Sequence, residues 1–193
     1  MRVAVLVSGT GSILESIIEH GVSVALVVSD RACGGLARAE AADIPAVLVE
    51  RTDFTKTFDR DAYSNRVADV LDAHGIDLVA MAGWGTIFSA AMHDRYGGRI
   101  LNTHPALLPA FPGWHAVRDA LAHGVKVTGC TVHVAGVEVD TGRILAQGSV
   151  EVSDDDDESS LHERIKTVER ELYPATILAV VDGRIPLQVP ENP

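Results

Sequence analysis

The chain has 193 residues, 47% of them hydrophobic, and its formal net charge at pH 7 is −11. This length and composition predict one globular domain over residues 1–193, and the negative charge argues against nucleic acid and anionic membrane surfaces as partners. The apolar start at residues 1–7 is too short for a signal sequence or a membrane span. Because Cys33 and Cys130 form no Cys-x-x-Cys motif, we expect a cytoplasmic protein with reduced cysteines.

The first strand is predicted at residues 2–7, a valine-rich run that suits a strand buried on both faces of a parallel sheet. A glycine-rich turn follows at residues 8–12, before a helix predicted over residues 13–20. Glycines and a helix N-terminus can hold an anion, although the same pattern also makes a plain tight turn. A dinucleotide fingerprint would need a third glycine at Leu14, yet Asp30 lies where a ribose-binding acid would sit. A nucleotide-binding module therefore stays open at this point.

Strands and helices alternate through the rest of the first half: strands are predicted at 22–28, 46–49 and 76–81, and helices at 36–42 and 58–74. This alternation predicts an α/β fold with a doubly wound, mostly parallel sheet. The segment after the strand at 76–81 leaves its carboxyl end, where open α/β sheets bind ligands. Its Trp84 and Phe88 suit the core equally well. On the helix at 58–74 we expect Phe58, Ala62, Val67, Val70 and Leu71 on one face.

The segment at residues 100–113 combines a strand ending with a stiff loop. Three prolines, at 105, 109 and 112, exclude a helix or a central strand beyond the strand predicted at 99–102. Asn102 and His104 lie two apart and project to the same side in extended geometry. Asn102 offers a hydrogen-bond donor and acceptor, and His104 can exchange a proton near neutral pH. Taken singly, each would be read as a turn or capping residue.

The second half begins with a helix predicted at 114–123 and continues with strands at 126–134 and 144–152, which predict an antiparallel extension of the sheet. Within the first of these strands Gly129 marks a close approach, and His133 shares a side with Thr131. The turn-rich loop at 136–142 contains Asp140, which taken alone is an ordinary turn residue.

The chain ends in a long helix predicted at 161–181. We expect a capping box from Ser160 to Glu163 to start it, and Lys166, Glu169 and Tyr173 to share one of its faces. The acidic run at 154–158 lacks the spaced ligands and the glycine turn of a hard-cation loop, so we interpret it as a solvated loop and expect no metal.

The residues Asn102 to Pro109, NTHPALLP, resemble the signature N-x-H-P-S/A-L-L-P of the folate-dependent formyltransferases. The following PGWHAVRDAL is most similar to those members whose acceptor is glycinamide ribonucleotide. The resemblance extends along nearly the whole chain, including the pattern D-x-G-x-I-L at 140–145. It implies a Rossmann-like formyltransferase fold, with residues 1–100 as the half that binds the phosphate and the ribonucleotide and residues 101–193 as the half that carries catalysis and binds the folate.

The resemblance also implies a set of site residues. Catalysis would rest on Asn102, His104 and Asp140, and His133 would face the substrate. The ribonucleotide would be bound by Gly9, Thr10, Gly11, Ser12, Ile13, Lys166 and Glu169. The folate would be bound by Arg60, Gly85, Thr86, Ile87, Phe88, Gly136, Val137, Glu138, Val139 and Asp140. Ile13 replaces the family's usual Asn, and Gly85-Thr86 replaces its usual Met-Arg.

The implied reaction moves the formyl group of 10-formyltetrahydrofolate, a co-substrate, to the amine of glycinamide ribonucleotide without a metal. Asn102 and His104 would stabilise a tetrahedral oxyanion, and His104 with Asp140 would move the proton. An aminosugar nucleotide remains an alternative acceptor. Formyltransferases acting on tRNA and formyltetrahydrofolate hydrolases are disfavoured because they carry a further domain. A nucleotide-binding module using Gly9, Gly11 and Asp30 leaves His104 and Asp140 unexplained. A homodimer is left open.

Overall fold

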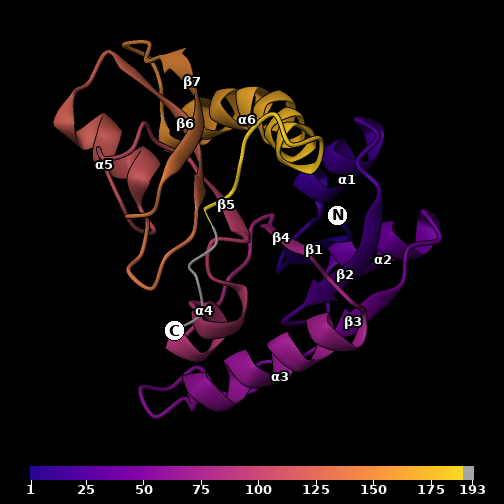
Figure 1. Cartoon of the computed structure of the whole chain (residues 1–193). Helices are drawn as coiled ribbons and strands as arrows, with labels where there is room; N and C mark the ends of the chain where they lie inside the picture. Colours follow the sequence, from indigo (N-terminus) through magenta and orange to yellow (C-terminus); the bar gives the residue numbers. More distant parts are fainter. Residues whose placement is uncertain (189–193) are drawn as a thin grey trace. The chain divides into compact units, whose positions relative to one another are not determined.

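A computed structural model describes residues 1–188 of the chain (Figure 1). The described chain divides into two compact units. The first unit comprises Met1–Leu101 with residues 187–188, and the second comprises Asn102–Pro186. The boundary falls inside strand β5 (Ile100–His104), so this strand begins in one unit and ends in the other.

The first unit alternates strands and helices as the sequence predicts. Its strands are β1 (Val3–Val7), β2 (Val24–Ser29), β3 (Ala46–Leu48) and β4 (Leu78–Met81), and its helices are α1 (Ser12–Glu19), α2 (Gly34–Ala41), α3 (Arg60–Ala73) and α4 (Ala90–Tyr96). The strand order is β3-β2-β1-β4, followed by the start of β5. Strand β1 runs parallel to both neighbours, pairing Val5 with Val27 and with Ala80. All five residues of β1 are buried, which explains their unbroken apolar pattern.

The helices of the first unit form two pairs, α1 with α2 and α3 with α4. Right-handed crossovers from β1 outward to β3 place α1 and α2 on one side of the sheet. The return to β4 and β5 places α3 and α4 on the other side, as Figure 1 shows. The doubly wound, mostly parallel fold class is therefore confirmed.

The first unit differs from the sequence predictions in two places. Helix α4 was not predicted, because seven residues after Ser89 are too few to show a helical period. On α3 the buried face consists of Tyr63, Ser64, Val67, Ala68 and Leu71. Ala62 is exposed instead, because Asp59 caps the helix and accepts a hydrogen bond from the Ala62 N–H at 2.9 Å, which sets the rotation of the first turn.

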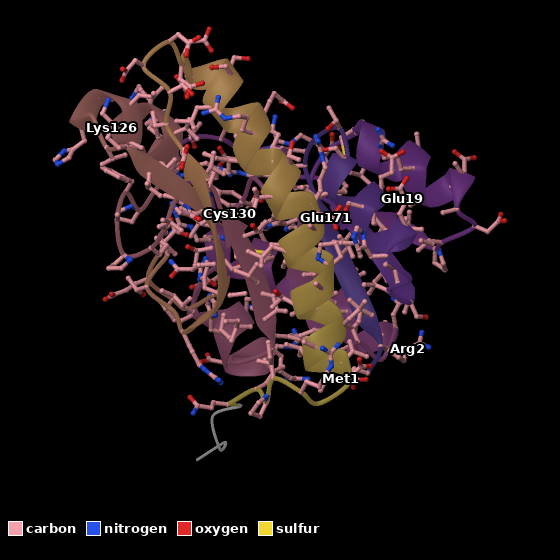
Figure 2. The ribbon with its side chains drawn as sticks, turned by 90° about the horizontal axis from the view of Figure 1, so that it is seen from above. Met1, Arg2, Glu19, Lys126, Cys130 and Glu171 are labelled. Atoms are coloured by element: carbon pink, nitrogen blue, oxygen red, sulfur yellow. The ribbon has the colours of Figure 1, made fainter. Side chains whose placement is uncertain are left out.

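The second unit contains the end of β5, α5 (Ala116–His123), β6 (Val127–Val134), β7 (Ile144–Glu151) and α6 (Glu158–Val181). Strands β6 and β7 are antiparallel, and α6 packs across both of them. Figure 2 shows Cys130 on β6 close to α6, the helix that carries Glu171. Cys130 forms a buried cluster with Val117, Val150, Leu161 and Ile165. The predicted antiparallel extension and the long final helix are confirmed.

Helix α6 begins three residues earlier than predicted. Asp157 is the N-cap, and it forms a reciprocal capping box with Ser160, so the predicted box from Ser160 to Glu163 was wrong. The neighbouring Asp156 side chain is only 3% exposed and binds Arg164 through two hydrogen bonds of 2.6 and 2.5 Å. The Arg164 guanidinium holds the pKa of Asp156 well below its usual value. The acidic run is therefore partly a structural element, not simply a solvated loop.

Gly129 on β6 lies where a side chain cannot fit, as the sequence predicts. A Cβ atom there would come within 1.9 Å of the Gly148 carbonyl oxygen on β7. No helix among residues 1–188 is both long and apolar enough to cross a lipid bilayer.

We expect Gly129→Ala to lower the free energy of unfolding by about 2–3 kcal/mol, because the two strands must separate to admit the methyl group. Urea denaturation followed by circular dichroism measures this. Ser149→Ala is the matched control, since Ser149 is exposed and pairs with Gly129 in the β6–β7 register. Equal stability of the two variants would contradict the prediction.

Candidate active site

The glycine-rich turn between β1 and α1 is held rigidly. Gly11 is the N-cap of α1 and has a φ angle of 79°, which favours glycine. The Gly35 N–H donates to the Gly9 carbonyl at 3.1 Å, and Arg38 Nε donates to the Thr10 carbonyl at 2.9 Å. A Cβ atom on Gly11 would lie 2.7 Å from Gly35 Cα. The N–H groups of the first turn of α1 are thus available to donate hydrogen bonds to an anion.

Ile13, which replaces the family's usual Asn, is 8% exposed and packs in the core. At this position only the main chain is available to a ligand. With Ile13 in place of Asn, the loop therefore lacks a polar side chain but keeps its backbone N–H donors.

Asp30, at the end of β2, is fully buried, and other side chains already bind it. Arg31 contacts it through two hydrogen bonds of 2.9 and 3.1 Å, and the Thr86 hydroxyl donates to it at 2.8 Å. Burial raises the pKa of Asp30, but hydrogen bonds from Arg31, Ser8 and Thr86 outweigh that effect and leave the pKa lowered. An ionised, buried and fully engaged carboxylate is unsuited to binding a ribose, which argues against the dinucleotide interpretation.

The segment after β4 places Trp84 and Phe88 in the core. Their rings stack with centroids 5.5 Å apart, and they are 8% and 5% exposed. Thr86 is also buried, so only the main chain of Gly85 and Thr86 and the half-buried Ile87 remain for a ligand. Arg60 is exposed at the first position of α3.

In the second unit, four side chains from three separate segments meet. Asn102 and His104 come from β5, His133 from β6, and Asp140 from the loop between β6 and β7. Asp140 Oδ2 lies 3.2 Å from His104 Nδ1, and Asp140 Oδ1 lies 3.6 Å from His133 Nε2. Asn102 Nδ2 lies 3.2 Å from His133 Nε2. The structure thus brings together the residues that the sequence analysis predicted as catalytic, along with His133.

Asp140 is the centre of this cluster. It also accepts a hydrogen bond from the Gly113 N–H at 2.8 Å, which ties the proline-rich loop to the carboxylate. Burial raises the pKa of Asp140, but hydrogen bonds from His133 and Gly113 and the charge of His104 outweigh it and hold the pKa below its usual value. Its φ angle of 58° is in the left-handed region, which Asp tolerates better than most residues.

Both ring nitrogens of His104 face acceptors. Nε2 lies 2.8 Å from the Phe111 carbonyl oxygen, and Nδ1 faces Asp140. A carbonyl and a carboxylate can only accept, so both hydrogen bonds form together only when the ring is an imidazolium with two N–H groups. The ring is therefore held in a fixed orientation from both sides.

His133 fixes the orientation of Asn102. Its Nδ1 lies 3.2 Å from the Val134 carbonyl oxygen. Its Nε2 lies between the Asn102 amide, at 3.2 Å, and Asp140 Oδ1, at 3.6 Å. The Asn102 amide is held between strands β5 and β6 and keeps its second N–H for another acceptor.

The proline-rich loop after β5 is pinned by the buried Thr131. The Thr131 hydroxyl donates to the Ala106 carbonyl at 2.7 Å and accepts from the Leu108 N–H at 3.0 Å. Gln147 on β7 donates to the Leu108 carbonyl at 2.8 Å. The stiff loop expected from three prolines is therefore held by strand side chains as well.

The sequence analysis missed the main-chain groups of Phe111 and Gly113, which bind His104 and Asp140. The available signal was the pair Pro112-Gly113, which marks a turn close to the catalytic motif. Side-chain motifs alone do not reveal such partners.

Residues 136–139, predicted to contact the folate, form an exposed loop. Val137 is 58% exposed and Val139 is 45% exposed. The Thr141 hydroxyl donates to the Glu138 carbonyl at 3.2 Å, which closes the turn. Exposed apolar side chains beside Asp140 offer a surface for a planar ring.

Glu169 on α6 is buried, and burial raises its pKa, with the Thr103 hydroxyl acting in the opposite direction. Lys166 Nζ pairs with the Glu163 carboxylate at 2.7 Å. Burial, together with the charge of Glu169, raises the pKa of Cys130 to about 12, so this thiol is not a nucleophile at neutral pH.

We expect Glu169→Gln to stabilise the protein by about 1–3 kcal/mol at pH 7, since Gln removes the cost of burying a charge. Below the unfolded pKa, near 4.5, both the folded and the unfolded state hold the proton, so the difference vanishes. It grows as the pH rises from 4.5 toward the raised folded pKa. Thermal melts between pH 4 and 8 measure it. Glu171→Gln on the same helix is the control, and a pH-independent difference would contradict the prediction.

Among residues 1–188 no group of three or more His, Cys, Asp or Glu side chains is arranged to hold a metal ion.

A family model described as "Formyl transferase" matches residues 1–177 of the chain. Phosphoribosylglycinamide formyltransferase of Mycobacterium tuberculosis (strain ATCC 25618 / H37Rv) is 47% identical over 184 residues, which cover 93% of this chain and 84% of that protein. The enzyme of the same name from Bacillus subtilis (strain 168) is 36% identical over 183 residues, covering 91% of this chain and 92% of that protein. The crystal structure of glycinamide ribonucleotide transformylase 1 from Symbiobacterium toebii matches with a TM-score of 0.89 and 40% identity, over 97% of this chain and 91% of that chain. Because the family model spans most of its length, this chain belongs to the formyl transferase family.

Proposed function

We propose that the protein transfers the formyl group of 10-formyltetrahydrofolate to the amino group of glycinamide ribonucleotide, a step of purine biosynthesis. The observation that carries this proposal is the cluster of Asn102, His104 and Asp140, in which the Asn102 amide lies against His133 and the His104 imidazole lies against the buried Asp140 carboxylate. Formyl transfer needs that combination of fixed donors and a proton carrier.

In the proposed reaction the acceptor amine attacks the formyl carbon, and the carbonyl oxygen becomes an oxyanion. The free N–H of Asn102 and the Nε2–H of His104, which otherwise donates to Phe111, stabilise this oxyanion. The amine then loses one proton, and the folate nitrogen gains one as its bond to the formyl carbon breaks. His104 relays this proton, and Asp140 keeps the ring oriented and charged.

The two substrates are assigned to different segments. The phosphate of the ribonucleotide would be bound by backbone N–H groups of the loop Gly9, Thr10, Gly11, Ser12 and Ile13. Lys166 and Glu169 would contact the same substrate, with Glu169 close to its amino group. The folate would be bound by Arg60, by the segment Gly85–Phe88 and by residues 136–140, and His133 would face the reacting groups. In this proposal residues 1–193 act as one formyltransferase domain.

A cytoplasmic location is part of the proposal, since Cys33 and Cys130 are free thiols and a reducing compartment preserves them. A homodimer also remains a prediction, which sedimentation velocity of the purified chain tests.

The deciding experiment follows release of the deformylated folate from 10-formyltetrahydrofolate by absorbance. It compares glycinamide ribonucleotide, an aminosugar nucleotide and no added acceptor. Turnover with glycinamide ribonucleotide alone supports the proposal. Turnover with the aminosugar nucleotide alone would assign the other acceptor, and release without any acceptor would indicate a hydrolase. Either of the last two results overturns the proposal.

A further inference from the structure

The buried carboxylate of Asp30 lies where the ends of three strands meet in the first unit. It is fully buried and accepts hydrogen bonds from Arg31 Nε and Nη2 at 2.9 and 3.1 Å and from the Thr86 hydroxyl at 2.8 Å. The Ser8 side chain contributes to lowering the pKa of this carboxyl group. These side chains come from the residues that follow β1, β2 and β4.

Ser8 joins this carboxylate to the main chain of the β4 segment. The Gly85 N–H donates to Ser8 Oγ at 2.6 Å, so the Ser8 proton is free to point at Asp30. Ser8 Oγ and Arg31 Nη2, which binds Asp30, thus both lie beside Gly85. Ser8 opens the loop assigned to the ribonucleotide, and Gly85 opens the segment assigned to the folate.

The position of Gly85 shows how closely these groups approach. A Cβ atom there would lie 3.1 Å from Arg31 Nη2 and 3.3 Å from Ser8 Oγ. The Arg31 guanidinium therefore fills the space beside Gly85 that a side chain would need. Gly85 stands where the family usually has Met. Its lack of a side chain leaves the space that Arg31 occupies while it binds Asp30.

Charge-assisted hydrogen bonds to a buried carboxylate are strong, and leaving such a carboxylate without its partners is costly. Ser8, Arg31 and Thr86 are therefore held in place together. Asp30 itself is fully buried, so it acts on a ligand only through the segments that it holds.

We propose that Asp30 is a positioning residue for both substrates, which sets the geometry of the ribonucleotide loop through Ser8 and of the folate segment through Thr86 and Gly85. This inference rests on the proposed function, because that function assigns the two segments to the two substrates. A single substitution at a side chain that contacts neither ligand is then expected to weaken the binding of both.

The test is the Asp30→Asn variant, which keeps the size of the side chain and removes its charge. We expect the KM for glycinamide ribonucleotide and the KM for 10-formyltetrahydrofolate each to rise about tenfold, the equivalent of one charge-assisted hydrogen bond. We expect kcat to stay within about twofold, because the cluster around Asp140 is untouched. A purely structural role would lower the melting temperature and leave both KM values unchanged, and that result overturns the inference, as does a change in only one KM.

Asp69→Asn is the matched control. It also removes a carboxylate from an arginine pair in the first unit, with Arg95 at 2.8 Å, but it lies on α3 outside both segments. Its two KM values should equal those of the unaltered protein. If Asp30→Asn fails to fold, Ser8→Ala replaces it, because that variant cuts the link from Gly85 to Asp30 and keeps the Asp30–Arg31 pair. The KM values for both substrates are again expected to rise. A rise in the KM for the ribonucleotide alone overturns the inference.

Calorimetric titration of glycinamide ribonucleotide and of tetrahydrofolate, each alone, separates this inference from the proposed function. Failure of the unaltered protein to bind either ligand counts against the proposed function. Binding of both ligands with dissociation constants that Asp30→Asn leaves unchanged counts against the role of Asp30 only.

Discussion

His104→Ala is expected to lower kcat for formyl transfer about 10³–10⁴-fold, because it removes an oxyanion donor and the proton carrier together. His104 is buried, and its ring is held at both nitrogens, by Asp140 and by the Phe111 carbonyl oxygen. Within the cluster, His104 is the imidazole whose two nitrogens both face oxygen acceptors, one of them a carboxylate. Steady-state kinetics with both substrates at saturation measure the loss.

The control is His162→Ala, since His162 is a half-buried histidine on α6 outside the cluster. Its kcat should remain within about twofold of the unaltered protein. Circular dichroism must show that His104→Ala is folded. A folded His104→Ala variant with near-normal turnover would remove this residue from the proposed mechanism.

Asp140→Asn is expected to reduce kcat about 10³-fold, because an amide cannot stabilise the imidazolium or hold its orientation. The structural reason is that one carboxylate serves His104, His133 and the Gly113 N–H at once. The KM values should change much less, since the loss falls on a group that acts in the transition state. Asp119→Asn on α5 is the matched control, since Asp119 pairs with the neighbouring Arg118 in a partly exposed site.

Asp140→Asn is also expected to change the free energy of unfolding in a pH-dependent way. The folded pKa of Asp140 lies below the unfolded value, near 3.8, so ionised Asp140 contributes stability above that pH. This contribution is lost as the pH falls from 3.8 through the lowered folded pKa. The unaltered protein should therefore unfold at a higher denaturant concentration than Asp140→Asn at pH 6, and the gap should narrow toward pH 3. A gap that is constant with pH would show that Asp140 is not ionised in the folded protein.

Local patterns in the sequence predicted most of the elements. The buried run of β1, the alternation of strands and helices, and the stiff loop after Asn102 all follow from the preferences of neighbouring residues. Predictions failed where local signals were short or competed. Helix α4 has only seven residues, and the start of α6 has two overlapping capping patterns, of which the structure uses the one from Asp157 to Ser160.

The resemblance supplied the candidate site, and the structure added what surrounds it. The sequence analysis named Asn102, His104, His133 and Asp140, and the structure places them in one cluster. The sequence did not reveal the Phe111 carbonyl or the Gly113 N–H as partners of these side chains, because main-chain groups have no signature in a sequence. Nor could it show that Thr86 is turned inward to Asp30, because burial depends on which strand ends meet.

By itself the sequence determined the order of the elements, the rigid geometry of the proline-rich and glycine-rich loops, and the chemical groups available for a reaction. Those properties depend on residues close together along the chain, whose steric and hydrogen-bonding preferences act over one or two turns. Only the tertiary structure decided which groups contact His104 and that Asp30 is buried among hydrogen-bond donors. A proton or a carboxylate responds to partners brought by distant segments and to burial, and both arise when the strands assemble.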